Sequence, residues 1–573
     1  MHSPFRKRGV ILASLLALAL AAALPSPAMA KPEPGAKKAS GFRLFARPLG
    51  AMTINRVYCG LSSDGQICVD STNSSTIGGG YWPKGTADQY IFNTGLQLAG
   101  VVGADGGPWA GDTTGAFFFD PKGTTQHGTQ VEPIYNMAST TDYNDICNPD
   151  PTGACQGNGD FRDAAFVPFG DESANIFNPL LTGSAASRKV QASQGDVWWM
   201  SWDGDPALNA GRSHPLGVVV ETRGMGWNFP AGNEDIIYFI YTFYNVTTTN
   251  PGDYVNVRPE MQNILLQKAQ EFQAKNNATF GVTLPTGGYT IDDLYAAFGT
   301  DMDVASAGTN YASVNLPFAL GYTYVQSFAG EVSWTFDPGG TTFTDPFFAG
   351  AGFAGIKYLK SPQGPGAIQL YSNTINGSPF PGAFNDPQNT IQLWRYLSGN
   401  ISVPAGDQPC NTGNPAVSRI CWINNTQPAD MRFYQSSTGF SLPPGGQGSI
   451  VVAYIFAAPV SVPGCPEGGA VCGGGNVKPG NPTILGNPAL MAGGVNLVDS
   501  LSGYISATDL DGSGVYEQEG TLGPEWTVVP KSLLGKSYTA QAVFDAGFLL
   551  PFAPIPPAFF LIPGNNQVTV MWQ

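Results

Sequence analysis

The segment Ile236–Asn245, IIYFIYTFYN, has the longest uninterrupted strand character in the chain, because it contains no charged residue, glycine or proline. Alternate side chains of a strand point to opposite faces. One face would carry Ile236, Tyr238, Ile240, Thr242 and Tyr244, and the other Ile237, Phe239, Tyr241, Phe243 and Asn245. Both faces are largely apolar, so we expect the central strand of a β-sandwich, covered on both sides. Any site in this half is expected on the neighbouring loops and not on the strand.

The composition is typical of a β-rich extracellular protein with many turns. Charged residues make up 12% of the chain and aromatic residues another 12%, beside 73 glycines and 47 prolines. Helical enzymes and disordered chains have different compositions. The formal charge of -15 at pH 7 argues against nucleic acid and anionic membranes as partners.

Residues 1–30 predict a secretory signal peptide. Basic residues at 6–8 precede an apolar stretch at 10–24, and residues 28–30 read Ala-Met-Ala, a typical cleavage site. The apolar stretch at 548–563 is interrupted by four prolines, so we expect no membrane span in the mature chain. The mature protein would be secreted or held at the cell surface. Its partners would be cell-surface or extracellular-matrix components, including glycans.

The eight cysteines form four pairs that are close in sequence, which favours disulfides within each pair. The predicted pairs are Cys59/Cys68, Cys147/Cys155, Cys410/Cys421 and Cys465/Cys472. Metal binding is the alternative, but the chain has no C-x-x-C motif of the kind common in zinc sites.

One segment, 259–276, interrupts the strand pattern. It begins with proline, and Met261, Leu265, Ala269 and Phe272 recur at helical spacing. A second, short helix is predicted at 291–298, with two aspartates near its start. Further strands are predicted at 316–324, 331–336, 368–371, 392–397 and 449–457.

Three tryptophans gather in the segment 196–205, DVWWMSWDGD. Trp198, Trp199 and Trp202 could form a carbohydrate-binding platform, because indole rings stack on sugar faces. The alternative is that Trp199 lies in the core while Trp198 covers an edge. Aromatic side chains dominate sandwich cores, and this favours the alternative.

The loop 509–520, DLDGSGVYEQEG, is the strongest candidate for ion binding. Calcium needs six to eight oxygen ligands, and EF-hand loops supply them at fixed spacing. Positions 1, 3 and 6 match that pattern, but position 12 is glycine. The candidate calcium ligands are Asp509, Asp511, Ser513, Glu517 and Glu519. The alternative is a solvated acidic turn. Two D-x-D pairs are weaker candidates: Asp301/Asp303 and Asp203/Asp205.

Catalytic motifs are scarce. Beyond the signal peptide the chain has two histidines, His127 and His214, and neither lies in a nucleophile or metal motif. There is no G-x-S-x-G, no dinucleotide fingerprint and no glycine-rich phosphate loop. A glycosidase needs two carboxylates, and Glu221 and Glu331, on predicted strands, are the least unreasonable candidates.

Two resemblances add to this interpretation. Residues 554–572, PIPPAFFLIPGNNQVTVMW, resemble the first two strands of a fibronectin type III domain, with a proline-rich entry, Val-Thr-Val and a tryptophan. This implies a spacer or binding module that continues past Gln573. Residues 298–303, 394–399 and 433–457 resemble a group of large secreted bacterial β-rich proteins without an assigned activity, which often carry fibronectin type III repeats or sorting tails.

The predicted fold is mainly β, with two large antiparallel β-sandwich-like units and one accessory helix, followed by an acidic-loop region and a truncated fibronectin type III start. The predicted segments are a signal peptide (1–30), a flexible lead-in (31–50), an N-terminal β domain (51–255), a second β domain (256–460), a Gly/Pro-rich linker (461–500), an EF-hand-like acidic-loop region (501–550) and a partial fibronectin type III domain (551–573).

These features together predict a secreted, non-catalytic structural or adhesive surface protein, stabilised by calcium and disulfides. Two alternatives remain open. The first is a carbohydrate-binding protein built around the three tryptophans, and the second is a polysaccharide-cleaving enzyme.

Overall fold

The structure is a computed structural model. It describes residues 49–117, 131–147, 193–304, 310–325, 353–375, 387–407, 430–457, 504–507, 526–528, 533–550 and 559–572, with short gaps inside several of these ranges. The signal peptide, the lead-in to residue 48, the linker, the loop 509–520, His127 and Glu331 lie outside the described residues.

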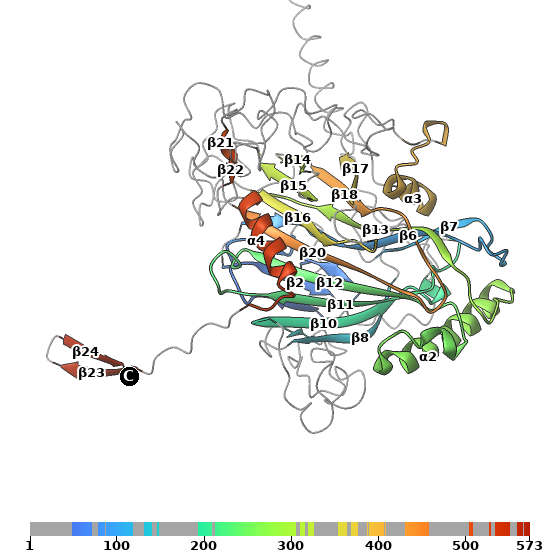
Figure 1. Cartoon of the computed structure of the whole chain (residues 1–573), viewed down its shortest axis with the longest axis horizontal. Helices are drawn as coiled ribbons and strands as arrows, with labels where there is room; N and C mark the ends of the chain where they lie inside the picture. The colour runs from blue at the N-terminus through green and yellow to red at the C-terminus, as the bar shows by residue number, and fades with distance from the viewer. Residues whose placement is uncertain are drawn as a thin grey trace, which may run out of the picture. The chain divides into compact units, whose positions relative to one another are not determined.

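The chain is mainly β, and two large antiparallel sheets dominate it (Figure 1). The first sheet contains β1 (Leu49–Met52), β2 (Tyr58–Ser62), β3 (Gln66–Ile67), β4 (Gly80–Tyr81), β5 (Gln89–Ile91), β6 (Asn93–Val102), β7 (Asp112–Phe117), β9 (Ile146–Cys147), β13 (Ile291–Asp301), β17 (Ile368–Ile375), β18 (Met431–Ser437) and β19 (Phe440–Leu442). Its main path runs β17-β18-β13-β6-β3-β2-β1-β9.

The second sheet runs β14-β15-β16-β20-β12-β11-β10-β8. Its strands are β8 (Glu132–Ser139), β10 (Gly195–Trp202), β11 (Val218–Gly226), β12 (Ile236–Asn245), β14 (Asn310–Asn315), β15 (Leu320–Val325), β16 (Phe353–Lys360) and β20 (Gln447–Ala457). Two separate hairpins are described, β21 (Tyr504–Ala507) with β22 (Trp526–Val528), and β23 (Phe559–Gly564) with β24 (Gln567–Trp572). The second hairpin covers the predicted fibronectin type III start, which stays a prediction.

The two sheets do not correspond to the two predicted β domains, 51–255 and 256–460. In the first sheet β13 pairs with β6, and in the second β20 pairs with β12. Each sheet therefore takes strands from both sides of the predicted boundary. Strand pairing is a contact between distant parts of the chain, which no local linker signal at residue 255 reports.

β12 lies at the centre of the second sheet, and the predicted cover on both faces is confirmed for its first half. Its inner side chains Ile237, Phe239 and Phe243 belong to the core between the two sheets. Its outer side chains Ile236 and Tyr238 belong to a second apolar cluster that includes α4 (Leu533–Asp545). Figure 1 shows α4 lying against β16 and β20. The sequence did not predict this helix, which supplies part of the cover of β12.

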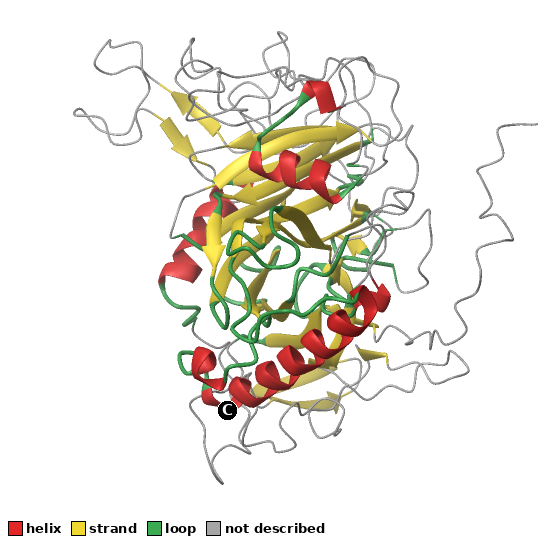
Figure 2. Cartoon of the chain, turned by 90° about the vertical axis from the view of Figure 1, so that its right-hand side faces the viewer, coloured by secondary structure: helices red, strands yellow, loops and turns green. Residues whose placement is uncertain are grey.

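The predicted helix at 259–276 is confirmed as α2, Pro259–Phe280, shown as the long helix in Figure 2. Its four apolar residues at helical spacing are all fully buried. It ends at Gly281, whose φ of 64° is left-handed and costs glycine little. The short 3-10 helices are η4 (Pro206–Leu208), η5 (Pro251–Tyr254) and η8 (Val403–Ala405).

The predicted helix at 291–298 is wrong, because this segment is the first part of β13. β13 lies between β6 and β18, so neighbours on both sides complete its hydrogen bonds. The side chains of Leu294, Ala296 and Phe298 point to the same face of the sheet and are fully buried in the core. A register shift between Asp292 and Tyr295 disturbs the alternation, and this explains the helix-like pattern.

The predicted strand at 392–397 is also wrong, because α3 spans Thr390–Ser398. The Asn389 side chain accepts a hydrogen bond from the backbone N–H of Gln392 at 2.8 Å, and Gly399 ends the helix with a φ of 69°. Both are ordinary helix boundary signals. Leu393 and Leu397 pack on the outer face of the first sheet.

The strand predicted at 316–324 is confirmed only over Leu320–Tyr324, within β15, because β14 already ends at Asn315. The strands predicted at 368–371 and 449–457 are confirmed within β17 and β20. The segment 331–336 lies outside the described residues.

One predicted disulfide is present, between Cys59 and Cys68, with a Cα–Cα distance of 4.3 Å. The other three pairs include Cys155, Cys410, Cys421, Cys465 and Cys472, which are not among the described residues. In the part of the chain that the structure describes, no helix is long and apolar enough to cross a membrane.

Candidate functional site

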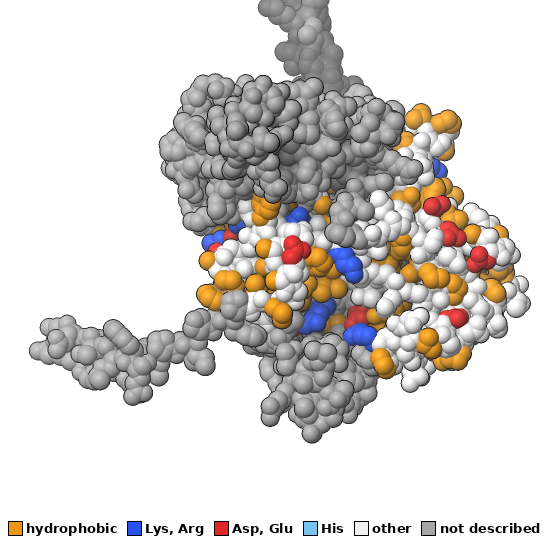
Figure 3. Space-filling view, in the orientation of Figure 1, with side chains coloured by type: hydrophobic (Ala, Val, Ile, Leu, Met, Phe, Trp, Pro, Cys, Tyr) orange, Lys and Arg blue, Asp and Glu red, His pale blue; other side chains and the backbone are white. Residues whose placement is uncertain are grey.

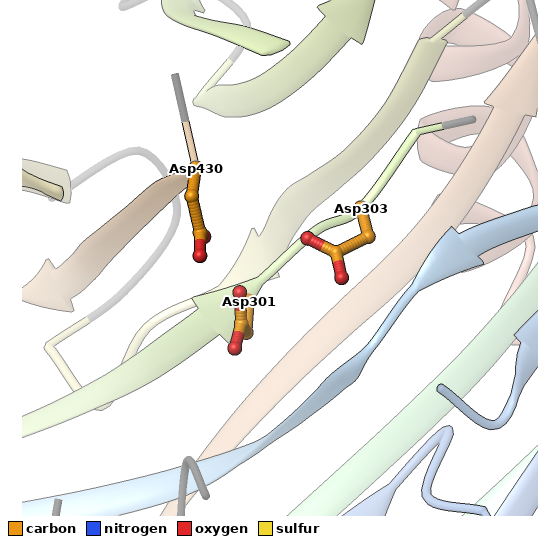
Figure 4. A group of neighbouring side chains, drawn as sticks. All are labelled: Asp301, Asp303 and Asp430. Atoms are coloured by element: carbon orange, nitrogen blue, oxygen red, sulfur yellow. The ribbon is translucent and has the colours of Figure 1, made fainter. Parts of the chain in front are cut away.

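Three aspartates converge where β13 ends and β18 begins (Figure 4). Asp301 is the last residue of β13, Asp303 follows two positions later, and Asp430 directly precedes β18. The antiparallel register places Asp301 opposite Arg432, so the end of one strand meets the start of the other. One oxygen from each carboxylate lies within 4.8 Å of the others. We call these residues the Asp triad.

One arginine and one glutamine contact the Asp triad among the described residues. Arg432 is nearly fully buried, and its Nε lies 2.9 Å from Oδ2 of Asp301. The Gln89 amide donates to Oδ2 of Asp303 at 3.1 Å but brings no charge. Three carboxylates thus gather around one guanidinium, and carboxylate oxygens are the ligands that hard divalent cations prefer.

Asp303 carries the clearest sign of a missing partner. Its Oδ1 atom is buried and accepts no hydrogen bond from any described residue. A buried oxygen without a donor is costly and rare in folded proteins. Burial, together with the charges of Asp301 and Asp430, raises the pKa of Asp303 well above its usual value. Either a cation or a proton would relieve this site.

The ligand atoms of the Asp triad select hard cations. Carboxylate oxygens suit calcium, magnesium and manganese, whereas zinc and copper prefer nitrogen and sulfur ligands. The sequence had marked Asp301 and Asp303 as a weaker D-x-D candidate. It did not indicate Asp430, because this residue joins the pair through strand pairing and stands far from it in the chain.

The other D-x-D pair has a structural role. The Asp203 carboxylate accepts hydrogen bonds from the backbone N–H groups of three successive residues, Leu216, Gly217 and Val218, at 2.7, 3.0 and 2.9 Å. Asp205 lies 2.6 Å from Lys275 Nζ and caps the turn at Ala207. Asp203 and Asp205 thus hold the turn between β10 and β11 and the helix α2.

The three tryptophans of β10 do not form a carbohydrate platform. Trp198, Trp199 and Trp202 are at most 1% exposed. Trp198 donates to Glu221 at 3.0 Å, and Trp202 donates to Glu132 at 2.9 Å while Lys268 covers its ring. Since no ring face is open to solvent, none can stack on a sugar. The core interpretation was the better one.

Glu221 lies on the outer face of the second sheet, beside a groove. Its carboxylate accepts hydrogen bonds from Trp198 and from the Tyr244 hydroxyl, each at 3.0 Å. Arg258 contacts both carboxylate oxygens at 2.8 Å. These three side chains occupy both carboxylate oxygens of Glu221. This arrangement suits an anchor better than a general acid.

The calcium loop predicted at 509–520 is separate in sequence from the Asp triad. Asp509, Asp511, Ser513, Glu517 and Glu519 lie outside the described residues, so that site stays a prediction.

Comparisons with known proteins identify no relative. No protein family model and no curated protein matches the chain. Among solved structures, a copper-containing benzylamine oxidase from Hansenula polymorpha is 8% identical with a TM-score of 0.26 and covers 71% of this chain. A "Putative aldose 1-epimerase" from Escherichia coli K12 is 8% identical, with a TM-score of 0.20, and the match covers 72% of this chain and 99% of that one.

An amine oxidase from Aspergillus nidulans is 8% identical, with a TM-score of 0.19 and 71% of this chain covered. The chain spans 59% of the Hansenula enzyme and 50% of the Aspergillus enzyme. Likeness at these scores carries no argument about function.

Proposed function

We propose that this chain is a secreted, non-catalytic structural or adhesive protein, and that calcium bound by the Asp triad stabilises its two-sheet core. The observation that carries the proposal is the buried Oδ1 of Asp303, which has no donor among the described residues and lies where three carboxylates converge. Calcium takes carboxylate oxygens in flexible geometry and usually completes its shell with water and backbone carbonyls.

The position of the Asp triad supports a stabilising role. Asp301 and Asp430 belong to neighbouring strands of the first sheet, so a bound cation would hold β13 and β18 together at one end. A ligand that binds the folded state alone stabilises it by about 2.7 kcal/mol at a hundred times its dissociation constant. This is a large fraction of the free energy of unfolding of an ordinary domain.

The direct test is calcium titration of the mature chain after chelation, followed by calorimetry and thermal unfolding. We expect heat of binding and a rise in the melting temperature, and both should be lost in Asp303→Asn. Asp293→Asn is the matched control, because Asp293 lies on the same strand, is exposed, and has a φ of 42° that asparagine tolerates. Asp511→Asn tests the loop 509–520 separately. Equal binding by the wild type and Asp303→Asn would refute the Asp triad site.

The pH dependence of stability, measured with and without calcium, distinguishes calcium binding at Asp303 from protonation of its carboxylate. The folded-state pKa of Asp303 is raised, so the metal-free protein should lose stability as pH rises from about 4 through that pKa. Calcium binds the ionised carboxylates, so its stabilising effect should grow over the same window. If Asp303 is relieved by a proton and binds no calcium, added calcium should not restore the stability that is lost at high pH.

Export is tested independently of the metal. Expression of the full chain in a secreting bacterial host, followed by N-terminal sequencing of the exported protein, should find a start at or near Lys31. Retention in the cytoplasm with an intact N-terminus would contradict the signal peptide prediction.

A further inference from the structure

The outer face of the second sheet has a hollow beside the region that α4 covers. A cavity of about 520 Å³ opens there, and Figure 3 shows Lys and Arg side chains gathered around a hollow on this face, with a carboxylate among them. It is lined by Glu221, Arg223, Ile240, Thr242, Tyr244, Arg258, Lys360, Pro362, Gln447, Gly448 and Ser449. We call this cavity the groove. Its volume lies in the range of ligand sites for small molecules.

The groove carries an excess of positive charge in a chain whose net charge is strongly negative. Arg223 pairs with Asp196 at 2.9 Å, and Arg258 pairs with Glu221 at 2.8 Å. Lys360 Nζ instead donates to the Ser449 hydroxyl at 2.8 Å. Among the described residues no carboxylate pairs with Lys360, which leaves one unbalanced positive charge on this wall.

Polar side chains form a row across the floor. Glu221 on β11 stands opposite Thr242 on β12, and Thr242 stands opposite Ser449 on β20. Directly opposed residues of neighbouring strands have side chains on the same face, about 5 Å apart. Thr242 and Ser449 therefore offer two hydroxyl groups to a ligand that lies across the strands, while Ile240 and Pro362 supply apolar contacts.

We propose that the groove binds a small, hydroxylated carboxylate, the chemistry of a sugar acid, with the carboxylate at Lys360 and the hydroxyl groups at Thr242 and Ser449. One unbalanced positive charge matches a monoanion. A dianion such as phosphate would be repelled by the Glu221 carboxylate. A neutral sugar would leave the Lys360 charge without a partner.

The charged contacts make the groove selective. Arg223 and Arg258 are partly exposed, with 19% and 31% of their side chains accessible, so both guanidinium groups lie at the rim of the groove. Since Asp196 and Glu221 hold these arginines in place, the site is arranged before the ligand arrives. Preorganised donors reduce the entropy lost on binding.

The test is isothermal titration of the mature chain with D-galacturonate and D-glucuronate at low ionic strength, with D-galactose as the neutral counterpart and inorganic phosphate as the dianion. We expect binding of a uronate that weakens with added salt, and much weaker binding of galactose and phosphate. Lys360→Gln should weaken uronate binding about tenfold, as expected for loss of a hydrogen bond to a charged group. Lys268→Gln is the matched control, because Lys268 lies on α2 and pairs with Glu271.

Thr242→Val is the second variant, since it keeps the shape of the floor and removes one hydroxyl. Absence of uronate binding by the wild type, equal binding of galactose, or unchanged binding in Lys360→Gln with an unchanged melting temperature would each overturn the proposal. The titrations are made in chelator and repeated with Asp303→Asn. Binding at the groove should persist there, so the outcome is independent of the Asp triad.

Discussion

The two halves of the outer face of β12 differ, although they belong to one strand. In the first half, Ile236 and Tyr238 are fully buried beneath α4 and its neighbours. In the second half, Ile240 and Thr242 are partly exposed and line the groove. The strand pattern is the same in both halves. The difference arises because α4, from the far end of the chain, reaches one half and not the other.

A carboxylate forms ion pairs beside each half, Asp235 at the covered half and Glu221 at the open half, and their surroundings differ. Asp235 accepts hydrogen bonds from Trp82 at 2.6 Å and from Lys536 of α4 at 2.7 Å, and it also pairs with Arg56. Burial by itself would raise the pKa of Asp235, but Lys536, Arg56 and Trp82 outweigh it and hold the pKa below its usual value. Glu221, in the open half, is anchored by a partly exposed arginine.

The largest effect is expected from Asp235→Ala, which breaks the contacts that join α4 to the sheets. Breaking a buried ion pair by removing one partner costs about 3–5 kcal/mol, because the remaining charge stays buried. Urea unfolding followed by fluorescence would measure the loss. In Lys536→Met with Asp235→Asn the lysine charge is also removed, and we expect part of the stability to return. A loss below about 1 kcal/mol for Asp235→Ala would show that α4 is held by apolar contacts alone.

A smaller loss is expected from Tyr238→Leu in the covered half. Tyr238 donates to Asn233 at 3.1 Å and packs edge-on against Trp227 and Phe548. Leucine keeps apolar volume but loses the hydroxyl and ring contacts, for a cost of about 1–3 kcal/mol. The control is Thr242→Val in the open half, where we expect a change within about 0.5 kcal/mol. Equal losses at the two positions would remove the distinction between the halves.

Glu221→Gln should cost less than Asp235→Ala, about 1–2 kcal/mol in urea unfolding. The amide loses the charge that faces Arg258, but the guanidinium can turn to solvent. Glu234→Gln is a control near the covered half. If Glu221→Gln instead abolished a polymer-cleaving activity without changing stability, the enzymatic alternative would replace the anchoring role.

The smallest effect concerns Lys357, which is buried in the half covered by α4. Burial lowers the pKa of Lys357 to about 8, although Asp545 opposes this. A lysine with a lowered folded-state pKa makes the folded state less stable below that pKa, and stability returns as pH rises from about 8 toward 10.4. Lys357→Met should raise the melting temperature by about 2–4 °C at pH 7. The gain should shrink by pH 10, and a gain that is constant with pH would contradict the titration.

The sequence predicted those elements whose signals are local. Periodicity placed β12 and α2, and proximity predicted the Cys59–Cys68 disulfide. The helix predicted at 291–298 and the strand predicted at 392–397 were wrong. A strand with a register shift imitates helical spacing, and the capping residues Asn389 and Gly399 carried more information than the apolar run between them.

The candidate sites were less predictable for the same reason. Asp301 and Asp303 were visible as a D-x-D pair, but Asp430 and Arg432 complete the Asp triad from another strand. The sequence does not predict the groove, because its lining comes from four strands, the segment before α2 and the turn after β16. We had expected any site near β12 on its loops, and the groove lies on the strand itself.

The sequence alone determined that this is a mainly β chain with a double-sided apolar strand, because side-chain periodicity and backbone propensity are properties of neighbouring residues. Only the tertiary structure decided which distant strands pair, which half of β12 is covered, and which charges meet. Those outcomes depend on contacts between residues hundreds of positions apart. In this molecule the cover of one half of a strand and the opening of the other half are both consequences of where α4 packs.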